Sequence, residues 1–170
     1  MSWKRPDVIE RMSRLLQDLP TDIRGYSLDA GTGSGVFTQI LQHLLGEAEF
    51  LQMDRHSFQP VVDLNYLGDL AALPHRPQSL SLIVIAQVLH YLPPQRRRTT
   101  LSTLANLLIA GGWLVIIEYE RDRSSSWLPY PYPEVKARSD LGPLSNMTTE
   151  QIYHDKDPRR PKYALYLRKN

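Results

Sequence analysis

An acidic residue and three alternating glycines are the part of this sequence best suited to chemistry. They lie in the segment Leu28–Gly35, LDAGTGSG, which joins the end of an apolar run to an amphipathic stretch, Val36–Leu45. Glycine adopts positive φ readily and lets a ligand approach the main chain. Three glycines between a predicted strand and a predicted helix therefore indicate a cofactor bound against the backbone, in the crevice at the carboxyl ends of the strands.

The spacing of the glycines argues against two common nucleotide motifs. The dinucleotide fingerprint G-x-G-x-x-G needs a third glycine where this chain has Val36, so a nicotinamide-dependent oxidoreductase is a disfavoured alternative. A P-loop ends in Lys followed by Ser or Thr, and this loop has no such pair. Asp29 stands at the start of the loop, which disfavours a phosphate and favours a ligand with an ammonium group.

The pattern D-x-G-x-G-x-G resembles the first motif of the class I S-adenosylmethionine-dependent methyltransferases. Further segments follow in that family's order, and they are Glu49–Asp54, Gly68–Pro74, Leu80–Leu92 and Leu107–Glu118. The resemblance covers residues 22–120 and is to the type 11-like methyltransferase domain, among small bacterial members of unassigned substrate. A merely structural turn is a weak alternative, because several segments match together.

The resemblance implies S-adenosyl-L-methionine as cofactor and S-adenosyl-L-homocysteine as product. An acid after the second strand accepts both ribose hydroxyls in this family, a role that falls to Asp54. Asp69 is expected to accept from the adenine amino group, with a simple loop cap as the alternative. The predicted cofactor-binding residues are Asp29, Gly31, Thr32, Gly33, Gly35, Asp54, Arg55, Asp69, Leu70 and Gln87.

Candidate catalytic and acceptor residues follow the fourth and fifth predicted strands. The candidates for a general base closest to the strand edge are His90, Tyr91 and Glu118, and for His90 a structural histidine at the strand end is the favoured alternative. Small bacterial methyltransferases have a similar Trp-x-Pro-Tyr-Pro stretch, which is either a pocket wall or a lid packed on the sheet. By this resemblance the acceptor side is expected to include Tyr119, Arg121, Trp127 and Tyr130, and Tyr91 is assigned to the same pocket.

Several chemistries are disfavoured by what the sequence lacks. Without cysteine, there is no thiolate metal site and no nucleophile for methylation of cytosine carbon 5. Gln87–His90 does not match the Asn- or Asp-Pro-Pro-aromatic motif of amino-group methylases, and no ligand set indicates a metal. The net charge of +2 decides nothing about a partner. Arginines that open a helix usually form a solvated face, so we expect Arg96–Arg98 to be solvated, and Arg159–Lys162 likewise. Nucleic acid is thus an unlikely partner, and no positive constellation indicates an acidic substrate.

The elements that position these residues alternate between strand and helix. We expect one domain, 1–170, with a Rossmann-like, doubly wound, mostly parallel α/β sheet of seven strands that ends in an antiparallel hairpin. The connection after the second strand is short for a parallel crossover, so its helix is abbreviated or missing, and the helix before the hairpin is short. Predicted helices are 6–19, 35–45, 94–108 and 134–141, and predicted strands are 26–30, 50–54, 64–68, 80–86, 113–119, 147–154 and 163–168.

The sequence therefore predicts an S-adenosylmethionine-dependent methyltransferase that acts on a small-molecule acceptor by in-line transfer. The alternative is a methyltransferase-like protein that binds the cofactor without transfer, as a regulatory or partner subunit. No apolar run reaches the roughly 18 residues of a membrane span, and residues 1–14 are charged throughout, so we expect a cytoplasmic enzyme without membrane association.

Overall fold

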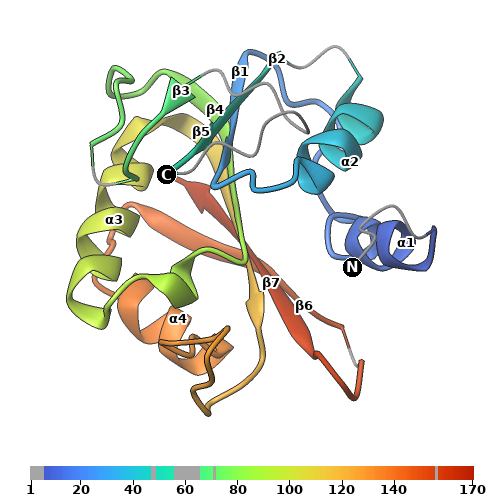
Figure 1. Cartoon of the computed structure of the whole chain (residues 1–170). Coiled ribbons are helices and arrows are strands. Elements are labelled where there is room, and N and C mark those ends of the chain that lie inside the picture. Colours follow the sequence, from blue (N-terminus) through green and yellow to red (C-terminus); the bar gives the residue numbers. More distant parts are fainter. Residues whose placement is uncertain (1–5, 47–48, 56–65, 71, 156) are drawn as a thin grey trace.

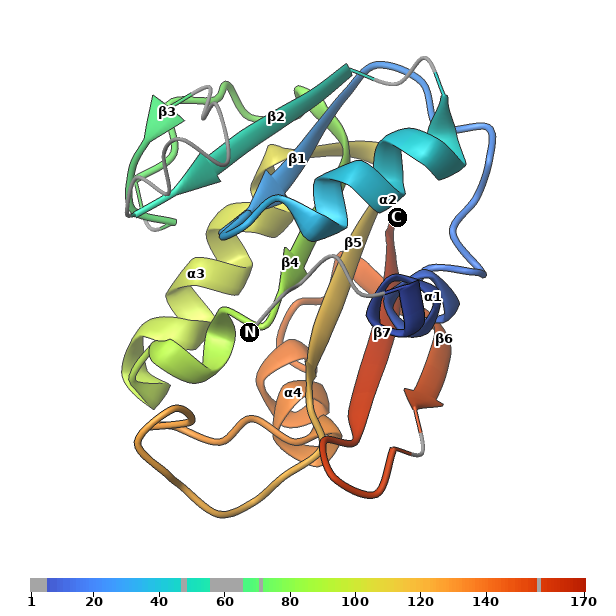
Figure 2. The same cartoon turned by 45° about the vertical axis from the view of Figure 1, so that its right-hand side comes forward.

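A twisted β-sheet runs through the molecule, with two helices on each of its faces (Figures 1 and 2). The structure is a computed structural model that describes residues 6–46, 49–55, 66–70, 72–155 and 157–170. Within these residues the sheet has seven strands in the order β3-β2-β1-β4-β5-β7-β6. The first five pair in parallel, and β7 is antiparallel to both β5 and β6. The predicted α/β fold with its antiparallel hairpin is confirmed.

The bounds of the elements agree with the predicted order. The helices are α1 (Pro6–Arg14), α2 (Val36–Leu45), α3 (Pro94–Leu107) and α4 (Glu134–Leu141), with a 3-10 turn, η1 (Leu89–Tyr91). The strands are β1 (Tyr26–Ala30), β2 (Glu49–Asp54), β3 (Tyr66–Leu67), β4 (Leu80–Ala86), β5 (Leu108–Tyr119), β6 (Met147–Asp155) and β7 (Lys162–Lys169). β3 contributes only two residues, and each of the other strands has five or more.

The two faces of β4 explain why its sequence is apolar except for Ser81. Every residue from Leu80 to Ala86 is buried, and the Ser81 hydroxyl donates to the carbonyl of Arg24. Ile83 and Ile85 belong to the core beneath α3 and α4, whereas Leu82 and Val84 pack with residues of α1 and α2. Successive side chains of a strand point to opposite faces, so a central parallel strand needs apolar residues at nearly every position.

The predicted first helix is too long, because α1 ends at Arg14 and not at Leu19. The next residues form tighter turns in which the N–H of Leu15 donates to the carbonyl of Met12. The carbonyl of Leu15, which a continuing helix would use, accepts from the hydroxyl of Tyr166 on β7. The buried residues 15, 16 and 19 thus reach the core from turns.

The fifth strand begins earlier than predicted, at Leu108, so the two glycines 111 and 112 lie within β5 and not in a turn before it. The pairing with β4 shifts between Leu80 and Leu82, and Gly111 has a φ of 75° at this irregularity. The predicted third strand, 64–68, is described only as Tyr66–Leu67, and residues 56–65 of the predicted short crossover lie outside the described residues.

The order of the strands places the candidate site. Successive strands lead from β1 outward through β2 to β3, and the chain then returns to place β4 on the other side of β1. In open α/β sheets, ligands bind outside the carboxyl ends of the strands where the order reverses.

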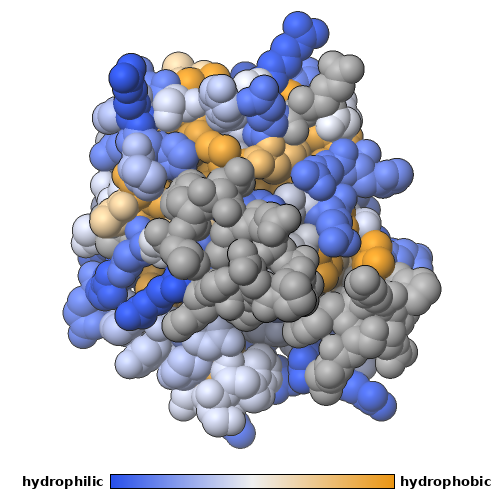
Figure 3. Space-filling model, turned by 45° about the horizontal axis from the view of Figure 1, so that its top comes forward, coloured by the Kyte–Doolittle hydropathy of each residue, from blue (hydrophilic) through white to orange (hydrophobic). Residues whose placement is uncertain are grey.

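Figure 3 shows that hydrophilic side chains cover much of the face it displays, with smaller apolar areas between them.

Candidate functional site

The glycine loop, which follows β1, packs against β2 and against the segment after β4 at the carboxyl edge of the sheet. Its glycines, Gly31, Gly33 and Gly35, have φ of 82°, 54° and 75°. A Cβ atom on Gly31 would lie 2.4 Å from the Cγ2 atom of Val88, after β4. The N–H of Gly31 donates to the carbonyl of Met53 on β2 at 2.8 Å. The loop is therefore fixed to β2 and to the segment after β4, in conformations that favour glycine.

Asp29 is buried beneath this loop, and one of its oxygens has no partner. Its Oδ2 atom accepts from the hydroxyl of Thr32 at 2.9 Å and from the hydroxyl of Thr38. Its Oδ1 atom is buried and accepts no hydrogen bond from the described residues. Burial raises the pKa of Asp29 to about 6, although the two threonine hydroxyls oppose this shift. Buried polar atoms are normally satisfied, so this oxygen fits a ligand with an ammonium group.

Asp54, the last residue of β2, faces the same loop. Its Oδ2 atom accepts from the main-chain N–H of Gly33 at 2.9 Å, and the residue is 9% exposed. Parallel pairing of β1 with β2 sets Ala30 opposite Met53, so the carboxylate and the glycines lie at one edge. Asp29 and Asp54 thus both accept hydrogen bonds from the loop that carries the glycines.

The remaining predicted cofactor residues lie at different depths. Thr32 is buried on Asp29, and Leu70 is buried as well, whereas Arg55 is exposed. Asp69 forms an ion pair with Arg96 at 2.8 Å and its side chain is 39% exposed. This pairing with α3 was not predicted.

Gln87, directly after β4, has an unusual backbone. Its φ is 58°, which is uncommon for a residue other than glycine and is found often at functional sites. Its main-chain N–H donates to the carbonyl of Ile117 on β5 at 2.7 Å, which anchors the turn. Its side-chain Oε1 atom accepts from the hydroxyl of Tyr119 at 2.5 Å. The turn therefore directs the Gln87 amide toward the end of β5.

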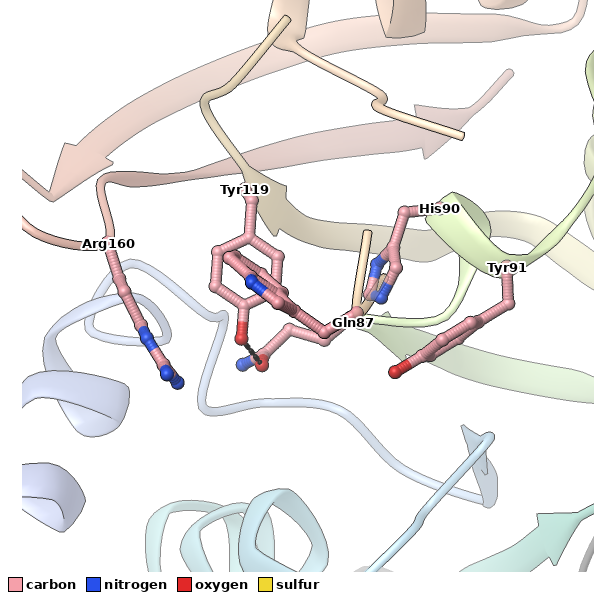
Figure 4. A pocket seen from close by; sticks show the side chains of 6 residues that line it. Gln87, His90, Tyr91, Tyr119 and Arg160 are labelled. Carbon is pink, nitrogen blue, oxygen red and sulfur yellow. Dashed lines mark hydrogen bonds between the residues drawn. The ribbon is translucent and has the colours of Figure 1, made fainter. Parts of the chain in front are cut away.

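A cavity of about 210 Å³ opens at this point, and we name it the strand-edge pocket. Figure 4 shows its lining side chains, which come from the ends of β4 and β5, from η1, from the segment between β5 and α4 and from the β6–β7 loop. The lining residues are Gln87, His90, Tyr91, Tyr119, Trp127 and Arg160. Arg160 was not predicted, because nothing in the sequence connects the hairpin loop with the ends of β4 and β5.

Tyr130, predicted for the acceptor side, lies elsewhere. Its ring lines a second hollow, of about 280 Å³, together with Pro94 of α3 and Asp140 of α4. Its main-chain N–H donates to the carbonyl of His90 at 3.0 Å, and its carbonyl accepts from Arg97. These two hydrogen bonds hold the backbone of Tyr130 in place. Tyr130 is not among the residues that line the strand-edge pocket, which corrects this part of the prediction.

A buried histidine and a buried glutamate form a pair at the wall of the pocket. The Nδ1 atom of His90 lies 2.8 Å from Oε2 of Glu118, and the main-chain N–H of His90 donates to Oε1 at 3.3 Å. The two residues are 1% and 0% exposed. An ionised carboxylate only accepts, so Nδ1 carries the proton and Nε2 is the basic nitrogen. The pair thus fixes both the orientation and the tautomer of a ring that also lines the pocket.

Arg97 overturns part of the expectation that the arginines opening α3 are solvated. Arg97 is 2% exposed, and its Nε–H donates to the carbonyl of Leu89 at 3.1 Å. Its guanidinium also donates to Tyr130 and lies 4.4 Å from the ring centre of Tyr132. The neighbours on either side are exposed, as expected. Arg97 therefore ties α3 to η1, which carries His90 into the pocket.

Comparison with known proteins places the chain in a family. A family model described as a methyltransferase domain matches residues 28–116, more than half of the chain. The chain belongs to this methyltransferase family. The resemblance and the enzyme class predicted from the sequence are confirmed, and S-adenosylmethionine as cofactor agrees with the family. No curated protein matches this methyltransferase.

Solved structures share the fold of this methyltransferase at low identity. A SAM-dependent methyltransferase from Aquifex aeolicus is 15% identical, with a TM-score of 0.72 over 98% of this chain and 99% of that chain. The N-methyltransferase NodS from Bradyrhizobium japonicum, in complex with S-adenosyl-l-homocysteine, is 18% identical, with a TM-score of 0.76 over 98% and 89%. The [4+2]-cyclase SpnF is 13% identical, with a TM-score of 0.73 over 99% and 83%. The fold is thus common to methyltransferases and to a cyclase.

Two structural features are absent from the described residues. Among them, no helix has the length and apolar character needed to cross a membrane. The same residues contain no group of three or more histidine, cysteine, aspartate or glutamate side chains arranged to hold a metal ion.

Proposed function

We propose that this methyltransferase binds S-adenosyl-L-methionine over the glycine loop and transfers its methyl group in line to a small molecule held in the strand-edge pocket. The observation that carries the proposal is the contact between loop and pocket. Gly31 packs on Val88, and the residue before Val88, Gln87, lines the pocket. A ligand on the loop would therefore lie beside a molecule in the pocket.

The residues at the edge of the sheet fit the parts of this cofactor. The unpartnered Oδ1 atom of Asp29 suits the ammonium group, and the Asp54 carboxylate beside Gly33 suits the ribose hydroxyls. Asp69 and Leu70 lie after β3 and are proposed to contact the adenine. The cofactor supplies a methyl group on a positively charged sulfur, which needs no further activation.

The chain itself must position the acceptor, exclude water and take up a proton where the acceptor holds one. The rings of Tyr91, Tyr119 and Trp127 form apolar walls around the acceptor. His90 is proposed to accept the proton at Nε2, while Glu118 stabilises the charged imidazole through Nδ1. We assign Glu118 a positioning role, because it acts through the histidine. The pocket of about 210 Å³ is smaller than the roughly 300–1,000 Å³ of sites for drug-sized ligands, which favours a small acceptor.

We further propose that the 170 residues form one cofactor-binding domain, since the described strands pair into one sheet from β3 to β6. The cytoplasmic location expected from the sequence stays a prediction. Nucleic acid stays an unlikely partner, and a protein partner belongs to the alternative in which the cofactor is bound without transfer.

Calorimetry with S-adenosyl-L-homocysteine tests the proposal. We expect binding with a Kd in the micromolar range, lost in Asp54→Ala and retained in the matched control Asp22→Ala, since Asp22 is exposed before β1. NAD should not bind. Transfer of a labelled methyl group is then measured over a panel of small acids, phenols and amines. If neither S-adenosyl-L-homocysteine nor S-adenosyl-L-methionine binds, the proposal is overturned. Binding without transfer to any panel member favours the alternative in which the cofactor is bound without transfer.

A further inference from the structure

Three cations gather around the aromatic rings at one end of the strand-edge pocket. The guanidinium carbons of Arg121 and Arg160 lie 5.8 Å and 5.3 Å from the ring centre of Trp127. The Nζ atom of Lys162 lies 5.2 Å from the ring centre of Tyr119. These residues come from the segment after β5, from the β6–β7 loop and from the start of β7. Arg160 and Lys162 are close in the sequence, and the fold brings Arg121 to them.

The expectation that Arg159–Lys162 is solvated is also wrong for its last residue, Lys162. Lys162 is 5% exposed, and its Nζ atom donates to the carbonyl of Arg160 at 3.2 Å. Burial, followed by the positive charge of Arg11, lowers the pKa of Lys162 to about 8. Asp155 and Asp157 oppose this shift without cancelling it. Lys162 is thus a buried cation and not a solvated one.

The acidic side chains close to these cations have other partners. Arg11 holds Asp155 at 3.0 Å and Asp157 at 2.5 Å. Glu118 is bound to His90. Across the part of the chain that the structure describes, neither of the arginines 121 and 160 forms an ion pair with a carboxylate. One amino group of Arg121 donates to the carbonyl of Arg159. The N–H donors of a guanidinium lie in its own plane, where those that remain can reach a planar anion.

The pocket has two chemically distinct ends. In Figure 4, Arg160 lies on one side of Tyr119, and His90 and Tyr91 lie on the other. The cationic end therefore stands opposite the end that carries the proposed base. Between them, the ring of Trp127 packs edge-on against the ring of Tyr119 at 5.1 Å, and both line the pocket. This arrangement suits a small molecule with an acidic group at one end and a nucleophilic atom at the other.

We infer that the acceptor carries a carboxylate, bound by Arg160 with help from Arg121, and that this group turns its nucleophilic atom toward His90. The inference rests on the proposed function and narrows it to acidic acceptors. It makes Arg160 a residue that determines specificity, because it is the cation that lines the pocket itself. Arg160 is exposed, with its guanidinium carbon 5.3 Å from the ring centre of Trp127, so its replacement should leave the fold intact.

Matched acid and amide pairs test the inference on the full chain with S-adenosyl-L-homocysteine present. The pairs are 4-hydroxybenzoate, indole-3-acetate and hexanoate, each with its amide of equal size, and binding is followed by calorimetry at pH 7. We expect the acid to bind at least about tenfold more tightly than its amide in one or more pairs. Arg160→Gln should abolish this preference. The control Arg159→Gln, which removes the same charge from the neighbouring position outside the pocket lining, should keep it.

The same titrations separate this inference from the function on which it rests. If the unsubstituted protein does not bind S-adenosyl-L-homocysteine, the proposed function is contradicted. Normal binding of that nucleoside, with no pair that prefers the acid, overturns the carboxylate inference alone. A preference that survives in Arg160→Gln and in the double variant with Arg121→Gln overturns it too, because the charge would then be recognised elsewhere. Thermal melting of each variant confirms that its fold is intact.

Discussion

Val88 occupies the space beside the Cα atom of Gly31, so a Cβ atom at Gly31 would lie 2.4 Å from the Cγ2 atom of Val88. Gly33, two residues later, also has positive φ, but a Cβ atom there would meet nothing closer than the carbonyl of Gly31 at 4.0 Å. The first glycine is thus required by packing and by conformation, whereas the second leaves open backbone above the sheet.

The two glycines should respond differently to alanine. Gly31→Ala should lower the free energy of unfolding by about 2–5 kcal/mol, since overpacking adds to the cost of a left-handed residue. Gly33→Ala should cost about 1–2 kcal/mol and keep the fold, but weaken S-adenosyl-L-homocysteine binding because its methyl group covers the ligand face. Urea unfolding and calorimetry measure both. A Gly31→Ala protein as stable as the unsubstituted one would contradict the packing argument.

Neighbouring arginines on α3 provide a second test. Arg97→Ala should lower the free energy of unfolding by about 2–4 kcal/mol, because the carbonyl of Leu89 loses its donor and the stack on Tyr132 is lost. Arg98→Ala is the control, since its ion pair with Asp140 is exposed, and should cost about 1 kcal/mol or less. Arg97→Lys should not restore stability, because one ammonium group cannot replace the planar donor set. Equal losses at the two positions in urea unfolding would argue against a buried anchor.

The histidine–glutamate pair predicts which acceptors depend on a base. For a hydroxyl acceptor that keeps its proton at pH 7, His90→Asn should lower kcat by about 10²–10⁴-fold while S-adenosyl-L-homocysteine still binds. For an acceptor already deprotonated at that pH, the loss should be much smaller. Glu118→Gln should act in the same direction, because the ring loses its charged partner at 2.8 Å. Equal losses for both acceptor types would assign His90 a purely structural role.

Two strands at the centre of the sheet were predicted with the bounds that the structure has. Residues 80–86 are apolar except for Ser81, as expected of a parallel strand that is buried on both faces. Residues 26–30, YSLDA, are less apolar, and they were predicted from their place directly before the glycine loop. The start of β5 was not predictable in this way. Its first residues pair irregularly with β4, and Gly111 and Gly112 resemble a turn when only the sequence is considered.

The wall of the pocket was predictable except for Arg160. Residues that follow β4 and β5 share one edge because parallel strands do, so His90 and Tyr119 were expected there. Arg160 reaches the same cavity from the hairpin loop, through antiparallel pairing that periodicity does not reveal. The burial of Arg97 between two exposed arginines depends on η1 folding back over α3, which no local pattern encodes.

The buried Asp29 makes a prediction about pH. Burial raises its pKa to about 6, from an ordinary value of 3.8. In the ligand-free protein, the stability that protonated Asp29 contributes is fully present below pH 3.8 and is lost as the pH rises to about 6, which amounts to about 3 kcal/mol. Asp29→Asn should lack this loss, as pH-dependent urea unfolding would show.

Binding of a ligand with an ammonium group should show the opposite dependence on pH. Such a ligand favours ionised Asp29, so the affinity for S-adenosyl-L-homocysteine should be constant above pH 6 and should fall about tenfold per pH unit below it. Asp29→Asn should remove this slope. The control ligand is 5′-methylthioadenosine, which has the same nucleoside and thioether without the amino-acid tail, and its affinity should vary little between pH 5 and 7. Calorimetry at half-unit steps separates these cases, and an equal slope for the two ligands would show that Asp29 does not face the ammonium group.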